Sequence, residues 1–510
     1  MPNLSRAQKS FFLFLLLSFS SSNIVLAMPP IPEIPDFPTV FSYGQTYHVD
    51  KDNGSDLVND GASEKPWATF QYGVNQLTAG DTLIVHEAVN GYDEIINISK
   101  TGSSNNWIVI KGADGESVVV KGGGMTFASN AKYIHLNNID INIQDAGWML
   151  LEIKNNAQYI VISDVEIDCH SSITNYTGVW VNAGGKNIWF KDMNIHHCGY
   201  KKTKPTDCSG VCLVRRLGAE DPLLDNIIFK NVTVSDNKGD GIGSQHVANV
   251  FFDGCIANNN TGDGFDIEAK IRAVFRNTIS SNNGPEDQGH GFKVWSKESW
   301  FLNCVAFNNA YHGIHNKPLH LESSIYILNS TFAGNSKYRA LGQVRFTNLF
   351  AREEPDLSTT KIFIYNNIFH TINTPGIAFG DWGNQTLVEE DKNYFFSAQE
   401  NKMPRAYNFA IELRESWVGN ANRFTKGYTF SDVDNGTWFK DTGYGKNDLG
   451  DTIKNKSVPH DPGFVKLYDD FRLKTGSRAI DAGRDVGLKT DFNGTPIPRR
   501  VAPDIGAYEY

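Results

Sequence analysis

Short apolar runs alternate with asparagine, aspartate and glycine along most of the chain. From about residue 82 the runs are three or four residues long, and a polar corner and a second short run follow each. Runs of this length, bounded by turn residues, predict β-strands rather than helices. Clear examples are 82–85, 107–110, 133–136, 159–162, 227–229, 325–328 and 362–365. The pattern therefore predicts an all-β chain of strand, corner, strand and corner.

Four segments of the chain are nearly superimposable and contain a central glycine. They are 239–243, 262–266, 289–293 and 311–315, and their glycines stand 23, 27 and 22 residues apart. A repeat of this length with one glycine-marked corner per period predicts a stacked solenoid, here a parallel β-helix. Equivalent residues of neighbouring rungs would lie about 4.8 Å apart. Corner asparagines such as those of 258–260 and 308–309 tolerate left-handed backbone and are expected to hydrogen-bond from rung to rung.

The two ends of the solenoid are expected to be covered. Apolar residues at Trp67, Phe70, Val74 and Leu77 have helical spacing, and Gly80 follows them, which predicts one short capping helix. Regularity fades after about 425, so 426–510 is interpreted as a C-terminal cap packed on the solenoid. Residues 28–42 are proline-rich and are interpreted as a linker, which leaves 43–425 for the β-helix domain.

The first 27 residues have the features of a secretory signal peptide. A basic start with Arg6 and Lys9 precedes an apolar run, and Ala27 ends a small-residue cleavage site. The run is too short for a membrane anchor, and no other segment is long enough to span a bilayer. We therefore expect a protein that is secreted, or held in the periplasm or at the cell surface. We also expect it to be a monomer.

The net charge argues against two classes of partner. The whole chain carries −10, and removal of the two cations of the leader makes it −12. Such a charge disfavours nucleic acid and anionic membranes, and an anionic substrate would need a local basic patch.

Five of the six cysteines divide into two kinds, and Cys169 is assigned to neither. Cys255 and Cys304 occupy equivalent places in their repeats and are expected to be reduced thiols in the core. Cys198, Cys208 and Cys212 lie in a longer insertion, where an exported protein can form one disulfide, and the sequence leaves the pair open. There is no Cys-x-x-Cys and no cysteine–histidine spacing typical of a metal site.

Aligning the repeats on their glycines produces three columns of residues. An apolar column after the glycine should point inward, and the columns on either side of it should carry the chemistry. The residues before the glycine are Asp240, Asp263, His290, His312 and, if Ala340 takes the glycine's place, Arg339. The inward residues are Ile242, Phe265, Phe292 and Ile314, and the next outward residues are Gly243, Asp266, Lys293 and His315.

The alignment brings three carboxylates and one amine together. Asp240, Asp263 and Asp266 would repel one another unless a cation lies among them. Calcium accepts six to eight oxygen ligands in irregular geometry, so it fits better than magnesium. Lys293, beside such a cation and partly buried, would have a lowered pKa and could act as a general base. A base beside a carboxylate-binding cation suits removal of the proton α to a uronate carboxylate, followed by β-elimination.

These motifs resemble the calcium site and catalytic lysine of polysaccharide lyase family 9, the pectate-lyase-like enzymes. The resemblance rests on Asp240, 262–266 and 289–293, and covers about residues 43–400. It implies a right-handed parallel β-helix, Ca²⁺ as cofactor and polygalacturonate as the default acidic polysaccharide substrate. The family has two adjacent aspartates before the middle glycine, whereas the first of these positions is Gly262 here. One implied ligand is therefore missing, and Glu268 or water is left to replace it.

Several further residues are candidates for binding the sugar chain. His290, His312 and His315 either bind hydroxyls or merely cap corners. Lys317 and Arg345, like Arg339, are candidates for pairing with substrate carboxylates. Trp295 follows Lys293 by two residues and is a candidate stacking platform.

Three alternatives to a lyase remain open from the sequence. A hydrolase on this fold would use two of the aspartates as acid and base or nucleophile. A uronate C5-epimerase would share the proton abstraction but leave the polymer intact. A non-catalytic carbohydrate-binding or adhesion solenoid would bind without turnover.

Overall fold

The computed structural model describes fourteen stretches of the chain. These are residues 28–143, 149–170, 177–199, 208–213, 222–285, 289–318, 323–336, 342–347, 360–372, 374–379, 387–397, 410–414, 424–452 and 462–510. Residues 31–510 form one large compact unit. The proposed signal peptide lies outside the described residues. No helix in the described stretches is long and apolar enough to cross a membrane.

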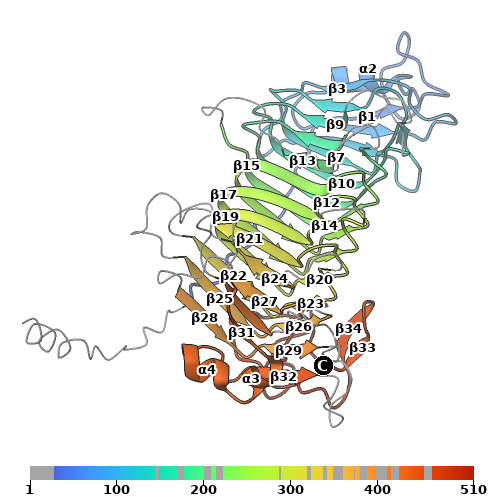
Figure 1. Ribbon diagram of the computed structural model, residues 1–510. Coiled ribbons are helices and arrows are strands. Elements are labelled where there is room, and N and C mark those ends of the chain that lie inside the picture. The colour runs from blue at the N-terminus through green and yellow to red at the C-terminus, as the bar shows by residue number, and fades with distance from the viewer. Residues whose placement is uncertain are drawn as a thin grey trace, which may run out of the picture. The chain divides into compact units, whose positions relative to one another are not determined.

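The large unit is a parallel β-helix, with three columns of strands stacked rung on rung (Figure 1). Column A contains β1 (Thr46–Val49), β2 (Thr82–Val85), β4 (Ile108–Gly112), β7 (Lys132–Asn137), β22 (Ser324–Leu328), β25 (Lys361–Tyr365) and β28 (Leu387–Asp391). Column B contains β5 (Val119–Val120), β8 (Asp140–Asn142), β16 (Ile256–Asn258), β18 (Ile279–Ser281), β20 (Val305–Phe307), β23 (Thr331–Ala333), β26 (Ile368–Thr371), β29 (Tyr394–Ser397) and β32 (Leu449–Thr452). Column C contains β3 (Ile96–Ile98), β6 (Met125–Phe127), β9 (Met149–Ile153), β11 (Thr177–Val181), β13 (Cys208–Leu213), β21 (Ile314–Pro318), β24 (Val344–Phe346), β27 (Ile377–Phe379) and β30 (Ile411–Arg414).

Six long strands bend at a corner and contribute to two columns each. Three of them join columns A and B, namely β10 (Gln158–Asp168), β12 (Lys186–His196) and β14 (Asp225–Ser235). The other three join columns C and A, namely β15 (Asp240–Asp253), β17 (Phe265–Arg276) and β19 (Phe292–Leu302). Among the described strands of the solenoid only β31 (Phe424–Tyr428) is antiparallel, on β30. The middle of the solenoid is therefore a stack of continuous ribbons, and it carries the candidate site.

The core is filled by side chains that repeat from rung to rung. The inward column predicted from the glycine alignment is present, and its four members are completely buried in consecutive register (Ile242, Phe265, Phe292 and Ile314). In column A, the rings of Phe229, Phe252 and Phe275 stack at centroid distances of 5.1 and 4.8 Å. Burial of such rows removes large apolar areas from water and fixes the register, because a one-residue slip would expose every second side chain.

A ladder of buried amides lies at the corner between columns B and C. The Nδ2 of Asn237 donates to Oδ1 of Asn260 at 2.9 Å, and the same contact repeats through Asn283, Asn309 and Asn335 at 3.1, 3.0 and 2.8 Å. The preceding corner residues, which include Asn259 and Asn308, have φ near +55°. The expected rung-to-rung hydrogen bonding of corner asparagines is confirmed, and the ladder supports the corner from which the site projects.

Short elements cover the ends of the solenoid. The predicted N-terminal helix is α2 (Phe70–Gln76), which buries Phe70 and Val74 against the first rungs. At the other end are α3 (Phe430–Asp434) and α4 (Thr437–Thr442), followed by β33 (Phe464–Lys466) and β34 (Asp470–Leu473). Phe464 and Phe471 form a second core with residues of β20, β23, β26 and β29, so the tail packs on column B. The boundaries assigned to the linker, the β-helix and the cap remain predictions.

The cysteines form two disulfides, one more than expected. Cys208 bonds to Cys212 within β13, and Cys198 bonds to Cys169, a residue outside the insertion from which a pair was expected. The insertion alone does not reveal this partner, because Cys169 lies on the preceding rung. Cys255 and Cys304 are buried free thiols, as expected.

Candidate functional site

Column C brings the predicted acidic residues and the lysine onto neighbouring rungs. Gly243 pairs with Asp266, Asp266 with Lys293, and Lys293 with His315. The backbone also connects the rungs here, because each central glycine donates its N–H to the residue that precedes the central glycine of the next rung. The Gly241 N–H donates to the carbonyl of Asp263 at 2.9 Å, and the Gly264 N–H donates to that of His290 at 2.9 Å. The register is therefore the one that the glycine spacing predicts.

The carboxylates of Asp240, Asp263 and Asp266, here called the acid group, converge on one point. Each offers an oxygen atom, and these atoms all lie within 4.8 Å of one another. Asp240 Oδ1 accepts the backbone N–H of Asp263 at 2.7 Å, and Asp263 Oδ1 accepts that of His290 at 2.7 Å. Asp240 and Asp263 are only 4% and 5% exposed, whereas Asp266 is partly open to solvent. Backbone amides thus hold two of the three carboxylates in place.

Lys293 is ion-paired to two members of the acid group. Its Nζ lies 2.7 Å from Asp266 Oδ2 and 3.2 Å from Asp263 Oδ2. Burial by itself lowers the pKa of Lys293, but Asp263, Asp266 and Asp240 together outweigh it and raise this pKa above its usual range. The expectation of a lowered pKa assumes a cation beside the amine. Without that cation the carboxylates determine the direction of the pKa shift, and the lowered pKa expected beside a bound cation stays a prediction.

The electrostatics of the acid group favour an added cation. Three carboxylates and one ammonium sum to −2 when all are ionised. Burial, followed by repulsion from Asp263 and Asp266, raises the pKa of Asp240 well above its ordinary value. Burial raises the pKa of Asp263 as well, and burial together with Asp263 raises the pKa of Asp266 to about 6. Oxygen ligands carrying an uncompensated charge of two fit a hard divalent ion such as Ca²⁺.

Gly262 leaves no room for a fourth carboxylate. A Cβ atom added there would lie 2.3 Å from Asp240 Oδ1 and 2.8 Å from both the backbone nitrogen of Asp240 and the carbonyl carbon of Gly239. The Asp240 carboxylate therefore occupies the space that a side chain at position 262 would need. Glu268 Oε1 pairs with Lys270 Nζ at 2.8 Å, and Glu268 is not among the carboxylates that converge in this arrangement.

Three histidines lie beside Lys293, as the sequence predicts. His290 Nε2 lies 3.2 Å from His315 Nδ1, and the ring centroids of His290 and His312 are 5.2 Å apart. Burial, aided by Lys293, lowers the pKa of His290 to about 3, and burial lowers that of His315 well below its ordinary value. Both rings are therefore neutral. His312 is 1% exposed with Nδ1 against the Gly342 carbonyl, while the buried Nδ1 of His290 has no hydrogen-bond partner among the described residues.

The remaining candidates lie further along the same face. Trp295 pairs in register with Lys317, whose Nζ lies 4.4 Å from the centre of the tryptophan ring, so one face of this ring is covered. Arg339 lies outside the described residues. The expected register also fails there, since Ile314 pairs with Val344 and the position after His312 in its column is Gly342. Arg345, not Arg339, continues the rungs, next to His315.

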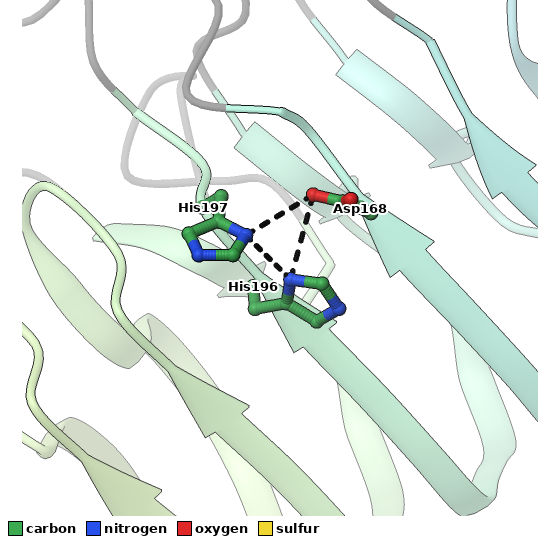
Figure 2. A group of neighbouring side chains, drawn as sticks. All are labelled: Asp168, His196 and His197. Carbon is green, nitrogen blue, oxygen red and sulfur yellow. Dashed lines mark hydrogen bonds and ion pairs between the residues drawn. The ribbon is translucent and has the colours of Figure 1, made fainter.

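The structure contains a second cluster of potential metal ligands, which the glycine alignment does not reveal. Asp168, His196 and His197, here called the histidine corner, lie where β10 and β12 end (Figure 2). A signal is present in the chain, because 168–170 and 196–198 each combine a cysteine with histidine and lie one rung apart. It is easily overlooked because neither segment contains a glycine-marked corner.

Several solved structures have limited similarity to this chain. A crystal structure of pectate lyase Pel9A has 17% identity and a TM-score of 0.40, over 92% of this chain and 97% of that one. A rhamnogalacturonan lyase has 15% identity and a TM-score of 0.41, over 69% and 87%. The A-module of the Azotobacter vinelandii mannuronan C-5 epimerase AlgE6 has 13% identity and a TM-score of 0.42, over 68% and 90%.

The family is settled by the sequence itself. No curated protein matches the chain. The model of a family described as a Pel9A-like, right-handed β-helix region matches residues 47–353, which is more than half of the chain and includes every rung of the acid group. The chain belongs to the Pel9A-like right-handed β-helix family.

Proposed function

We propose that the protein is an exported polysaccharide lyase that cleaves a uronate-containing polymer, with polygalacturonate as the default substrate. Lys293 is the general base, and Asp240, Asp263 and Asp266 hold a calcium ion. The observation that carries the proposal is the position of Lys293 Nζ within 3.2 Å of both Asp263 and Asp266, on the rung that follows theirs. A base and a cation site that share one small surface are what abstraction of a proton α to a carboxylate requires.

The exposure of these side chains supports the proposed roles. The side chains of Asp266 and Lys293 are 30% and 26% exposed, whereas that of Asp263 is 7% exposed. Lys293 therefore reaches a polymer on the surface, while Asp240 and Asp263 lie beneath it. This arrangement argues against a hydrolase, which needs two carboxyl groups flanking the glycosidic bond.

The charges around Lys293 explain how it becomes a base. Neutralising the three carboxylates cancels the field that raises the Lys293 pKa, and burial then remains to lower it. The neutral rings of His290 and His315 supply no competing proton. We expect the free amine to be populated only when the acid group is neutralised by a cation.

In the proposed reaction Lys293 Nζ takes the proton α to the uronate carboxylate. The electron pair of that C–H bond forms a carbon–carbon double bond, the glycosidic C–O bond at the β-position breaks, and the leaving oxygen takes a proton from solvent. Bound calcium supplies the electrostatic stabilisation of the carboxylate as negative charge develops on it.

The test is a comparison of two lysine variants on one strand. Lys293→Ala is expected to lower the rate of formation of ultraviolet-absorbing unsaturated uronate by about 10²–10⁴-fold. Lys297→Ala, an exposed position on the same strand β19, serves as the matched control. Polygalacturonate, alginate and glycosaminoglycans would be screened with and without calcium. Full activity in Lys293→Ala, or no unsaturated product from any uronate polymer, would refute the proposal.

The same assay separates the alternatives. New reducing ends without ultraviolet absorbance would indicate a hydrolase, and altered uronates in an uncut polymer would indicate an epimerase. Binding without turnover, unchanged in Lys293→Ala, would indicate an adhesion module.

Export is part of the proposal and has its own support. Two disulfides are typical of an oxidising compartment, and the leader-like first 27 residues point the same way. A partner other than the acidic polysaccharide is not needed for the reaction, and we propose that the protein acts as a monomer.

A further inference from the structure

The histidine corner brings three potential ligand atoms into one small triangle (Figure 2). His196 Nδ1 lies 2.8 Å from His197 Nδ1 and 3.4 Å from Asp168 Oδ1, and the third side, from His197 Nδ1 to Asp168 Oδ1, measures 3.2 Å. Asp168 and His196 are paired residues of neighbouring rungs. Stacking of the coils, rather than proximity along the chain, therefore creates the cluster.

We propose that the histidine corner binds a divalent transition metal, with Zn²⁺ as the fitting ion. Two imidazole nitrogens and one carboxylate oxygen would hold it, and water would take a fourth position. Imidazole is a ligand typical of zinc and its neighbours, whereas calcium selects oxygen. This site is separate from the acid group and does not depend on the proposed lyase activity.

The dimensions of the triangle suit zinc. Zinc lies about 2.0–2.2 Å from nitrogen and carboxylate ligands in tetrahedral sites, which places neighbouring ligand atoms about 3.3 Å apart. The three measured separations, 2.8, 3.2 and 3.4 Å, lie around that value. An ion slightly above the plane of the triangle would reach all three atoms without moving the backbone. The His197 side chain is 42% exposed, which leaves the fourth position open to solvent.

The other nitrogen of His196 is held as in known zinc sites. Its Nε2 lies 3.0 Å from Glu166 Oε1, a residue two positions before Asp168 on the same strand. A metal-bound histidine usually donates its second ring N–H to a carboxylate, which fixes the tautomer and leaves the first nitrogen as a lone-pair donor. The Glu166 contact thus turns His196 Nδ1 toward the proposed ion.

The two corners that carry the ligands are covalently joined. Cys169 follows Asp168, Cys198 follows His197, and these two cysteines form a disulfide. His197 also has a left-handed backbone with φ +58°, in the corner position occupied by Asp236, Asn259 and Asn282 on the next three rungs. Asparagine and aspartate are the usual non-glycine residues in this conformation. A histidine in their place adds a ligand without changing the corner.

A second histidine–histidine–carboxylate set in the chain lacks this convergence. His48 Nδ1 lies 3.0 Å from His86 Nε2, and the other nitrogen of His86, Nδ1, lies 3.1 Å from Glu116 Oε1. The contacts therefore run in a line through both nitrogens of one ring, and no three atoms face one point. Each set contains two histidines and one carboxylate but the geometry differs, so the set of His48, His86 and Glu116 makes a matched control for the histidine corner.

The experiment measures metal binding in purified full-length protein stripped with EDTA and returned to excess Ca²⁺, which keeps the acid group filled. Zn²⁺ is titrated by calorimetry, and Co²⁺ absorption reports the coordination geometry. One Zn²⁺ per chain is expected in the parent protein. His197→Asn, which restores the residue type found on later rungs, should fold normally and lose this binding. His48→Asn should keep it.

A graded variant tests the orientation argument. Glu166→Gln keeps all three ligands and should weaken Zn²⁺ binding by about 10–100-fold, the range for such supporting contacts. Absence of Zn²⁺ binding in the parent protein would overturn the proposal. Binding that survives His197→Asn would place the metal elsewhere, for example at the histidines near Lys293, and would overturn it equally.

Discussion

The histidine corner lies at the end of column B and the acid group at the start of column C on later rungs, and the two are built in opposite ways. The acid group repeats one type of residue along a column, and its two buried members are held by backbone N–H groups of the next rung. The histidine corner mixes nitrogen and oxygen ligands and is joined by a disulfide. The first is a cluster of like charges that needs a cation, whereas the second can satisfy itself by hydrogen bonds. The contrast is between two proposed metal sites on one scaffold, one with hard oxygen ligands and one with mixed nitrogen and oxygen ligands.

The sharpest test of the contrast adds metals back singly to EDTA-treated protein. Ca²⁺ is expected to restore polymer cleavage by at least about 100-fold, because Lys293 stays protonated while the carboxylates are uncompensated. Zn²⁺ alone, at a hundredfold excess over its Kd, should stabilise the folded protein by about 2.7 kcal/mol and so raise its melting temperature. It should not restore cleavage. Initial rates and thermal melts of the same samples check both. Restoration of cleavage by Zn²⁺ alone would show that the two sites are not distinct.

Removing the disulfide should weaken only one of the two sites. Cys169→Ser combined with Cys198→Ser is expected to lower the free energy of unfolding by about 2–5 kcal/mol and to weaken Zn²⁺ binding. The matched control replaces Cys208 and Cys212, which enclose a much shorter loop and should lower stability less. Denaturant melts and Zn²⁺ calorimetry measure the two effects. Equal Zn²⁺ affinity in both double variants would mean that the ligands need no covalent support.

We expect one substitution in the acid group to raise the free energy of unfolding, whereas loss of the disulfide lowers it. At alkaline pH, where the Asp240 carboxyl is ionised in spite of its raised pKa, Asp240→Asn should stabilise the calcium-free protein by about 1–3 kcal/mol, because it removes a buried charge and keeps an oxygen for the Asp263 N–H. It should also reduce the stabilisation that Ca²⁺ confers. Asp253→Asn is the control, since Asp253 lies 2.7 Å from Arg276 and its neutralisation should destabilise. Destabilisation by both variants in calcium-free buffer would show that the acid group is already compensated.

The smallest expected effect is the pH dependence of calcium binding. The pKa of Asp266 is about 6 in the folded, metal-free protein and about 3.9 in the unfolded chain. Its contribution to stability is therefore fully present below about pH 4 and is lost as the pH rises through about 6. Calcium needs the ionised carboxylate, so its affinity should fall about tenfold from pH 7 to pH 5. Calcium titrations across this range measure the slope, and a flat profile, or one unchanged in Asp266→Asn, would contradict the assignment.

Much of the fold and of the acid group could be predicted because both repeat. The glycine spacing determines which residues of 239–243, 262–266 and 289–293 share a column, and the apolar residue after each glycine determines which way the others point. The prediction failed at Arg339, because a longer stretch between His315 and Val344 shifts the register so that Gly342 takes the expected place.

Other features depend on contacts that repeat spacing does not encode. The Cys169–Cys198 bond and the histidine corner lie at the end of column B, where no glycine marks the rung. The pKa of Lys293 depends on the balance between burial and three carboxylates, which only the three-dimensional arrangement determines. The corner asparagines, by contrast, are recognisable because left-handed backbone restricts the choice of residue.

The crowding at Gly262 restricts the order in which this site can change. An aspartate introduced at position 262 would collide with the Asp240 carboxylate and with the backbone behind it, so it cannot act as an extra ligand while Asp240 keeps its place. The effects of substitutions at these two positions are therefore epistatic. An aspartate can be accommodated at position 262 only after substitutions have moved the backbone at 239–240. If the aspartate comes first, the protein has a disrupted acid group until the backbone moves.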